Sequence, residues 1–137
     1  MEVQINMIIN ELGVKVIDRE FLDADGHYIA EINTIVINSK LSKWEKLKAL
    51  LHELGHACKH HKDYYLYNIA FSLHSKMEYE ANYYMIEKLL DSYILATGLE
   101  PQQINYMKFI EDVGLDHRYE PEVKKILAEL IRYCEIM

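Results

Sequence analysis

Two histidines one helical turn apart, in the segment His52–His56 (HELGH), constrain this chain more than any other feature. On an α-helix, residues four positions apart lie on the same face, so both imidazoles point the same way. Two imidazoles in this arrangement can bind one zinc ion, and Glu53 beside them can take a proton from metal-bound water. The alternative is an exposed helix face that carries solvated His and Glu side chains.

The HELGH motif lies within a helix that the sequence predicts from Ser42 to about His60. Ser42 is a good N-cap, and Glu45 completes a capping-box pattern. Gly55, in mid-helix, indicates a close approach of another backbone, because glycine there costs about 1 kcal/mol relative to alanine. At the end of this helix, His60 and His61 are interpreted as solvated imidazoles. One stripe of side chains is predicted to face the core: Trp44, Leu47, Leu50, Leu51, Leu54 and Cys58.

A second long helix, predicted from about His74 to Ala96, offers a third metal ligand. Glu78 shares a stripe with apolar side chains, where a carboxylate is costly unless it is paired or binds metal. Glu80 falls on the predicted solvent side, so we predict Glu78 as the ligand; the alternative for Glu78 is a buried salt bridge. Asn82, one turn beyond Glu78, is predicted to accept a hydrogen bond from a ligand histidine. Its alternative role is an ordinary contact between helices.

The remaining segments predict a small sheet and further helices. The predicted elements are a helix over Glu2–Leu12, strands over Val14–Ile17, His27–Ile32 and Thr34–Asn38, a helix from Pro101 to about Val113 and a last helix from Pro121. We expect the strands to form a small antiparallel sheet of about three strands, followed by a mainly helical body. The expected fold class is therefore α+β. The state of residues 63–73 is left open between strand, helix and loop.

Composition and charge restrict the class of protein. The chain has 137 residues and no Pro/Gly/Ser-rich linker, so we expect a single domain over residues 1–137. The formal net charge of −7 argues against direct binding to nucleic acid, which needs concentrated Lys and Arg. No signal-peptide pattern is present, and no apolar stretch approaches the roughly 20 residues that cross a bilayer. We therefore expect a cytoplasmic protein that does not enter a membrane.

The HELGH motif together with the later segment Glu78–Asn82 (EYEAN) resembles the ImmA/IrrE-type metallopeptidases, a gluzincin-like group of phages, mobile elements and bacteria. The resemblance covers about residues 27–92. It implies a zincin-like fold in which His52, His56 and Glu78 bind Zn²⁺ and Glu53 is the catalytic base. In this family the partner is often a helix-turn-helix transcriptional repressor that the peptidase cleaves.

The resemblance therefore implies a zinc-dependent metallo-endopeptidase that cleaves a repressor or a similar regulator of a phage or mobile element. The main alternative is a regulatory protein that binds a repressor through a zincin-like fold without cleaving it. A metal-free helical interaction module is a third interpretation. The donor that would stabilise the oxyanion stays open among His60, His74, Tyr79 and Tyr83. A strand in the region Thr34–Asn38 is a candidate edge for pairing with an extended substrate.

Overall fold

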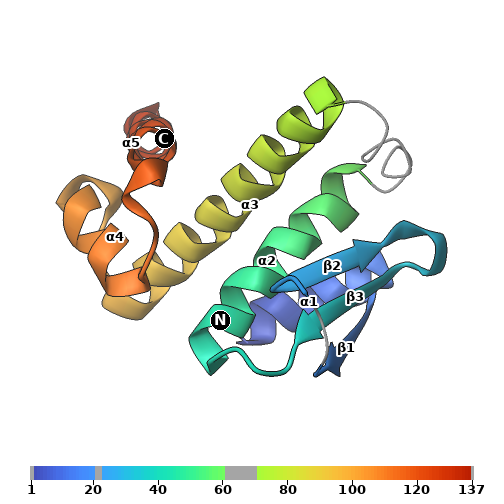
Figure 1. The fold of residues 1–137 in the computed structure, drawn as a ribbon. Coiled ribbons are helices and arrows are strands. Elements are labelled where there is room, and N and C mark those ends of the chain that lie inside the picture. The colour runs from blue at the N-terminus through green and yellow to red at the C-terminus, as the bar shows by residue number, and fades with distance from the viewer. Residues whose placement is uncertain (1, 21–22, 61–70, 137) are drawn as a thin grey trace. The chain divides into compact units, whose positions relative to one another are not determined.

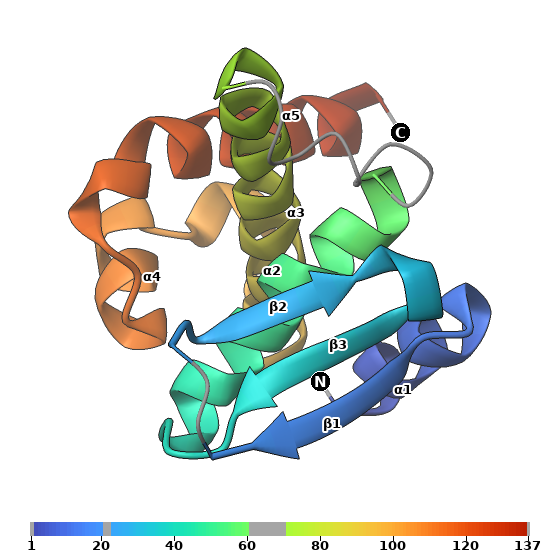
Figure 2. The same cartoon turned by 45° about the vertical axis from the view of Figure 1, so that its right-hand side comes forward.

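A three-stranded sheet follows the first helix of the chain (Figures 1 and 2). The computed structural model describes residues 2–20, 23–60 and 71–136. The strands are β1 (Lys15–Arg19), β2 (Gly26–Ile29) and β3 (Thr34–Asn38), in the order β1-β3-β2. The sheet and the helices around and after it confirm the predicted α+β class.

The sheet is mixed, so the prediction that it is antiparallel is wrong for one strand pair. β2 runs antiparallel to β3, but β1 runs parallel to β3. The physical reason is that β3 lies between the other two strands. The chain passes from β1 to the far side of β3 before β2 begins, and the turn-forming residues Asp23–Gly26 do not join neighbouring strands.

Asn33 fixes the connection between β2 and β3. It adopts the left-handed conformation (φ 47°), which asparagine tolerates better than most residues, and it ends the short 3₁₀ turn η1 (Ala30–Ile32). Its Nδ2 donates to the carbonyl oxygens of Leu12 and Gly13, each at 3.0 Å, and its Oδ1 accepts from the Tyr28 hydroxyl at 2.8 Å. These bonds attach the sheet to the end of helix α1 (Glu2–Leu12).

Helix α2 (Lys43–His60) packs against β2 and β3 and carries the HELGH motif. Its predicted cap is confirmed, because the Ser42 Oγ accepts from the Glu45 backbone N–H at 3.2 Å. The predicted core stripe is partly wrong: Leu51 and Leu54 are fully buried, whereas Trp44 is 39% exposed and Cys58 is exposed. α2 contacts the sheet on one side and helix α3 (Phe71–Thr97) on another, so its buried face is wider than one apolar stripe.

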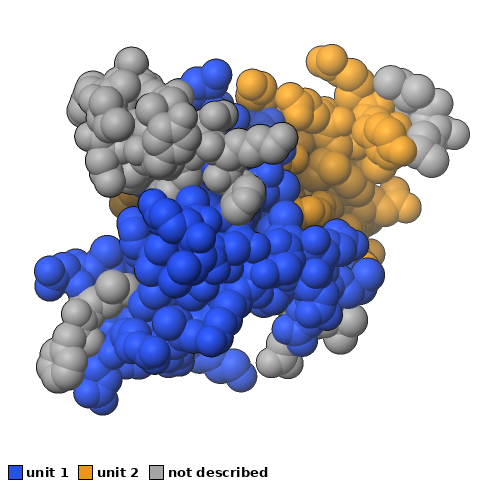
Figure 3. All heavy atoms as spheres, turned by 90° about the vertical axis from the view of Figure 1, so that its right-hand side faces the viewer, with its two compact units in different colours: residues 1–85 blue, residues 86–137 orange. Residues whose placement is uncertain are grey.

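The chain divides into two compact units, residues 1–85 and 86–137, which are coloured separately in Figure 3. The second unit contains the end of α3, the 3₁₀ turns η3 (Pro101–Gln103) and η4 (His117–Tyr119), and helices α4 (Tyr106–Val113) and α5 (Glu120–Ile136). A single domain over the whole chain stays a prediction. None of the helices that the structure describes combines the length and the apolar sequence needed to cross a membrane.

The helix predicted from Pro101 is shorter than expected. Pro101 begins only the turn η3, and α4 starts five residues later, after Asn105. The Asn105 side chain accepts hydrogen bonds from the backbone N–H groups of Met107 (2.9 Å) and Lys108 (3.3 Å), and this N-cap sets the start of the helix. Within this unit Phe109, Ile110 and Val123 are completely buried.

Candidate metal centre

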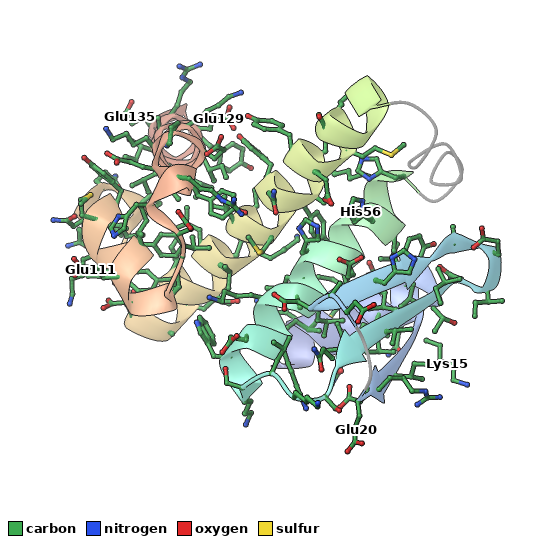
Figure 4. The ribbon with its side chains drawn as sticks, in the orientation of Figure 1. Lys15, Glu20, His56, Glu111, Glu129 and Glu135 are labelled. Carbon is green, nitrogen blue, oxygen red and sulfur yellow. The ribbon has the colours of Figure 1, made fainter. Side chains whose placement is uncertain are left out.

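Helix α2 brings together three side chains that can act as metal ligands. The ligand atoms of His52, Glu53 and His56 all lie within 4.8 Å of one another. His56 is 1% exposed and Glu53 is 6% exposed, and Figure 4 shows His56 on the side of α2 that faces α3. The solvated helix face that was the alternative for this motif is therefore wrong, because two of its three polar side chains are buried.

Glu78 reaches this group from α3. Its Oε2 lies 2.9 Å from the Nε2 of His52 and 3.0 Å from the Nε2 of His56. The Glu53 carboxylate lies farther away, with its Oε2 3.8 Å from the Nε2 of His52. The Glu78 side chain is 30% exposed, so its stripe is less buried than predicted. One carboxylate oxygen thus lies between the two imidazoles, and a second carboxylate lies at the side of the group.

Gly55 permits the close packing of α2 and α3 that the glycine in mid-helix predicted. A Cβ atom at this position would lie 3.0 Å from both the Cα and the carbonyl oxygen of Ala81, and 3.2 Å from the Cβ of Tyr84. Backbone atoms cannot move away as a flexible side chain can. The missing side chain at Gly55 therefore sets the distance across which Glu78 reaches the histidines.

We expect Gly55→Ala to lower zinc affinity while changing the free energy of unfolding only slightly. Alanine gains about 1 kcal/mol of helix propensity, which offsets part of the roughly 1–3 kcal/mol that overpacking costs. The shift that relieves the overpacking moves Glu78 relative to α2. Zinc affinity is measured by competition with a chromophoric chelator, and stability by denaturant unfolding of the metal-free protein. Cys58→Ala, at an exposed position on the same helix, is the control, and unchanged affinity in Gly55→Ala would contradict this account.

The edge strand β2 holds the Glu53 side chain. The Tyr28 backbone N–H donates a hydrogen bond to the Glu53 carboxylate. A Cβ at Gly26 would lie 3.2 Å from the Cγ of Glu53, so the glycine leaves room for this side chain. Burial raises the pKa of Glu53; His52 opposes this shift and Glu78 adds to it. A carboxylate in these surroundings is a stronger base than one in water.

The two motif histidines have different electrostatic surroundings. Burial disfavours the charged form of His52, but the hydrogen bond to Glu78 and the charge of Glu53 outweigh it, so the pKa of His52 is raised. For His56, burial dominates and the pKa is lowered, although Glu78 acts in the opposite direction. Burial therefore favours the neutral imidazole of His56, the form that binds metals.

Asn82 contacts this group from α3, one turn beyond Glu78. Its side chain is hydrogen-bonded to His52, which favours the charged form of that ring. The sequence predicted this contact between Asn82 and a motif histidine, and the structure places the two side chains together. Glu78 and Asn82 thus approach the histidine pair from successive turns of one helix.

We expect Asn82→Ala to weaken zinc binding about 10-fold or more. This is the usual cost of losing an outer partner, a residue that hydrogen-bonds to a ligand histidine without touching the metal. Asn82→Asp keeps an oxygen acceptor for the His52 ring, so it should retain most of the affinity. Chelator competition on both variants tests this expectation. Equal losses in Asn82→Ala and Asn82→Asp would show that the hydrogen bond to His52 does not support metal binding.

His60 is a member of this polar cluster that the sequence interpretation placed wrongly. It was expected to be solvated, but it is only 5% exposed, and its Nδ1 lies 3.1 Å from the Nδ1 of His56. Its Nε2 lies 3.7 Å from the Oε1 of Glu80, which was interpreted as a plain surface charge. Burial and the neighbouring His56 lower the pKa of His60. The available signal was the spacing, because His60 follows His56 by the same four residues that separate the motif pair.

Three other predictions concern the surroundings of the centre. β3 is the central strand, so it offers no free edge for a substrate; β2 is the edge strand beside Glu53. Tyr79 is 48% exposed, and nothing in its described contacts selects it as an oxyanion donor. The His74 side chain and His61 lie outside what the structure describes, as do residues 63–70 of the segment left open, whereas residues 71–73 belong to α3.

Comparison with known proteins agrees with this geometry. A search of curated proteins found no match. A family model described as the IrrE N-terminal-like domain, of the M78 peptidases, matches residues 9–124. The match covers the sheet, both helices of the candidate centre and most of the second unit. The chain belongs to the IrrE N-terminal-like, or ImmA/IrrE, family of M78 metallopeptidases.

Proposed function

We propose that this protein is a zinc-dependent endopeptidase in which His52, His56 and Glu78 hold the metal and Glu53 is the catalytic base. The observation that carries the proposal is the position of the Glu78 Oε2, 2.9 and 3.0 Å from the Nε2 atoms of His52 and His56. The contrast with Glu53, which lies 3.8 Å from one of these rings, supports different roles for the two carboxylates.

The donor set fits zinc. Nitrogen and oxygen ligands about 2.0–2.1 Å from a tetrahedral zinc ion lie about 3.3 Å from one another. The Glu78 Oε2, from α3, lies nearly at that separation from the Nε2 atoms of both His52 and His56, which come from α2. Two imidazoles and one carboxylate leave a fourth position for water, as in catalytic zinc sites of His₂Glu type.

The residues around the proposed metal site have different roles in peptide hydrolysis. Zinc held by these residues would lower the pKa of a water molecule and polarise the scissile carbonyl. Glu53 takes a proton from the attacking water and returns it to the leaving amine. Burial raises the pKa of Glu53 and makes it a better proton acceptor, and the Tyr28 N–H and the space at Gly26 hold its carboxylate in place.

Membership of a peptidase family implies a protein substrate. We propose that an extended segment of this substrate pairs with the outer edge of β2 (Gly26–Ile29), because within the described sheet β2 pairs only with β3 and it lies beside Glu53. We further propose that the substrate is a helix-turn-helix repressor or a similar regulator of a phage or mobile element. The support for that last step is the family to which the chain belongs.

The test is a cleavage assay with the repressor encoded nearest to this gene. The zinc-loaded protein should generate a new N-terminus in the repressor, identified by mass spectrometry. A chelator should stop the reaction and added zinc should restore it. A repressor that is bound but stays intact under all these conditions would instead support the regulatory binding protein.

A further inference from the structure

A row of polar contacts leads from the buried side chain of His56, through His60, to Glu80. The Nδ1 of His56 lies 3.1 Å from the Nδ1 of His60, and the two ring centroids are 5.2 Å apart. The other ring nitrogen of His60, Nε2, lies 3.7 Å from the Oε1 of Glu80. The side chains of His56 and His60 are 1% and 6% exposed, whereas that of Glu80 is 37% exposed.

The contact between the two Nδ1 atoms constrains the tautomers. A neutral histidine that binds a metal through Nε2 carries its proton on Nδ1. The His56 Nδ1–H must then donate to His60, whose Nδ1 accepts. A neutral His60 that accepts at Nδ1 carries its own proton on Nε2, the nitrogen that is near the Glu80 carboxylate.

We propose that His60 is a positioning residue that accepts the His56 Nδ1–H and thereby fixes the tautomer and ring orientation of His56, with Glu80 favouring the required tautomer of His60. This inference rests on the proposed function, since it assigns His56 Nε2 to the metal. In this arrangement His60 on α2 is the hydrogen-bond partner of His56, just as Asn82 on α3 is the hydrogen-bond partner of His52.

A role in packing alone does not explain this arrangement. Among the described residues, the buried Nε2 of His60 has no hydrogen-bond partner, because the 3.7 Å to Glu80 is longer than a hydrogen bond. Leaving a buried donor in this state costs about 1–3 kcal/mol, which an apolar side chain of similar size would avoid. A histidine at position 60 is useful here because its Nδ1 can accept a hydrogen bond from His56 while its Nε2–H faces the Glu80 carboxylate.

The proposal also accounts for the two glutamates of the EYEAN segment. Glu78 contacts the motif histidines directly, whereas Glu80, two residues later, points to a different neighbour, His60. In this proposal Glu80 acts on the centre through His60. It follows that the effects of replacing Glu80 and His60 are not additive.

The test measures zinc affinity by chelator competition in His60→Leu, His60→Asn, Glu80→Gln and the double variant His60→Leu/Glu80→Gln. Asparagine places its Oδ1 near the position of the histidine Nδ1 and so keeps an acceptor for His56. We expect His60→Leu to lose about 10-fold or more in affinity and His60→Asn to recover most of it. Glu80→Gln should lose less than His60→Leu, and the double variant should match His60→Leu. His117→Leu, at an exposed position in the second unit, is the control.

Two further readouts separate positioning from stability. Long-range ¹H–¹⁵N spectra of the zinc-loaded wild type should show His60 protonated on Nε2 and His56 on Nδ1. The visible spectrum of the Co²⁺-substituted protein should change in His60→Leu and return in His60→Asn. A His60 proton on Nδ1, or equal losses in His60→Asn and His60→Leu, would overturn the proposal, as would wild-type affinity in His60→Leu. Absence of zinc binding by the wild type would overturn the proposed function and this inference together, whereas the other results leave the zinc site intact.

Discussion

Glu53→Gln is expected to bind zinc about as tightly as the wild type and to lose peptide hydrolysis by about 10²- to 10⁴-fold, the usual contribution of a general base. Glutamine has the shape of glutamate, so it fits the space beside Gly26 and can still accept from the Tyr28 N–H. What it lacks is the ability to take a proton. The rate at which a new N-terminus appears in the repressor, with zinc content measured on the same samples, checks this.

Glu111→Gln is the matched control for Glu53→Gln, because Glu111 is exposed in the second unit. It should cleave and bind zinc as the wild type does. Loss of zinc from Glu53→Gln would show that Glu53 is a ligand. If wild type and Glu53→Gln behave alike in every assay, the protein is a regulatory binding protein that keeps the metallopeptidase fold without using it for cleavage.

Local sequence signals predicted the elements that carry the centre better than the way they assemble. The Ser42 cap marks the start of α2 because capping depends on neighbouring residues alone. The direction of β1 could not be predicted in the same way. Whether β1 pairs with β2 or β3 depends on where the connection after Arg19 crosses the sheet, and no short motif encodes that path.

Helical phase predicted that Glu78 and Glu80 point in different directions, but it did not predict the surroundings of Glu80. The two side chains do point to different neighbours, Glu78 to the motif histidines and Glu80 to His60. The interpretation of Glu80 as a surface charge assumed that α2 buries one stripe only. Because α2 contacts both the sheet and α3, the face that includes His60 is also covered, and this depends on the close approach at Gly55.

The second large effect is expected in Glu78→Gln, which should lose more zinc affinity than the roughly 10- to 100-fold that loss of an outer partner costs. The amide keeps a polar oxygen near the two imidazoles but lacks the negative charge that a divalent cation favours. Because the amide still places a polar oxygen near the two imidazoles, metal-free Glu78→Gln should unfold at a temperature close to that of the metal-free wild type. Thermal unfolding with chelator and with excess zinc checks both statements on the same sample.

Glu78→Gln also separates a ligand from a buried salt bridge, the alternative role for this residue. A ligand binds only in the folded state, so zinc should raise the unfolding temperature of the wild type by an amount that grows with zinc concentration. In Glu78→Gln this rise should be largely lost, while Glu80→Gln, two residues away, should keep most of it. An equal rise in Glu78→Gln and the wild type would mean that Glu78 only pairs with the histidines, and that the third ligand is another group.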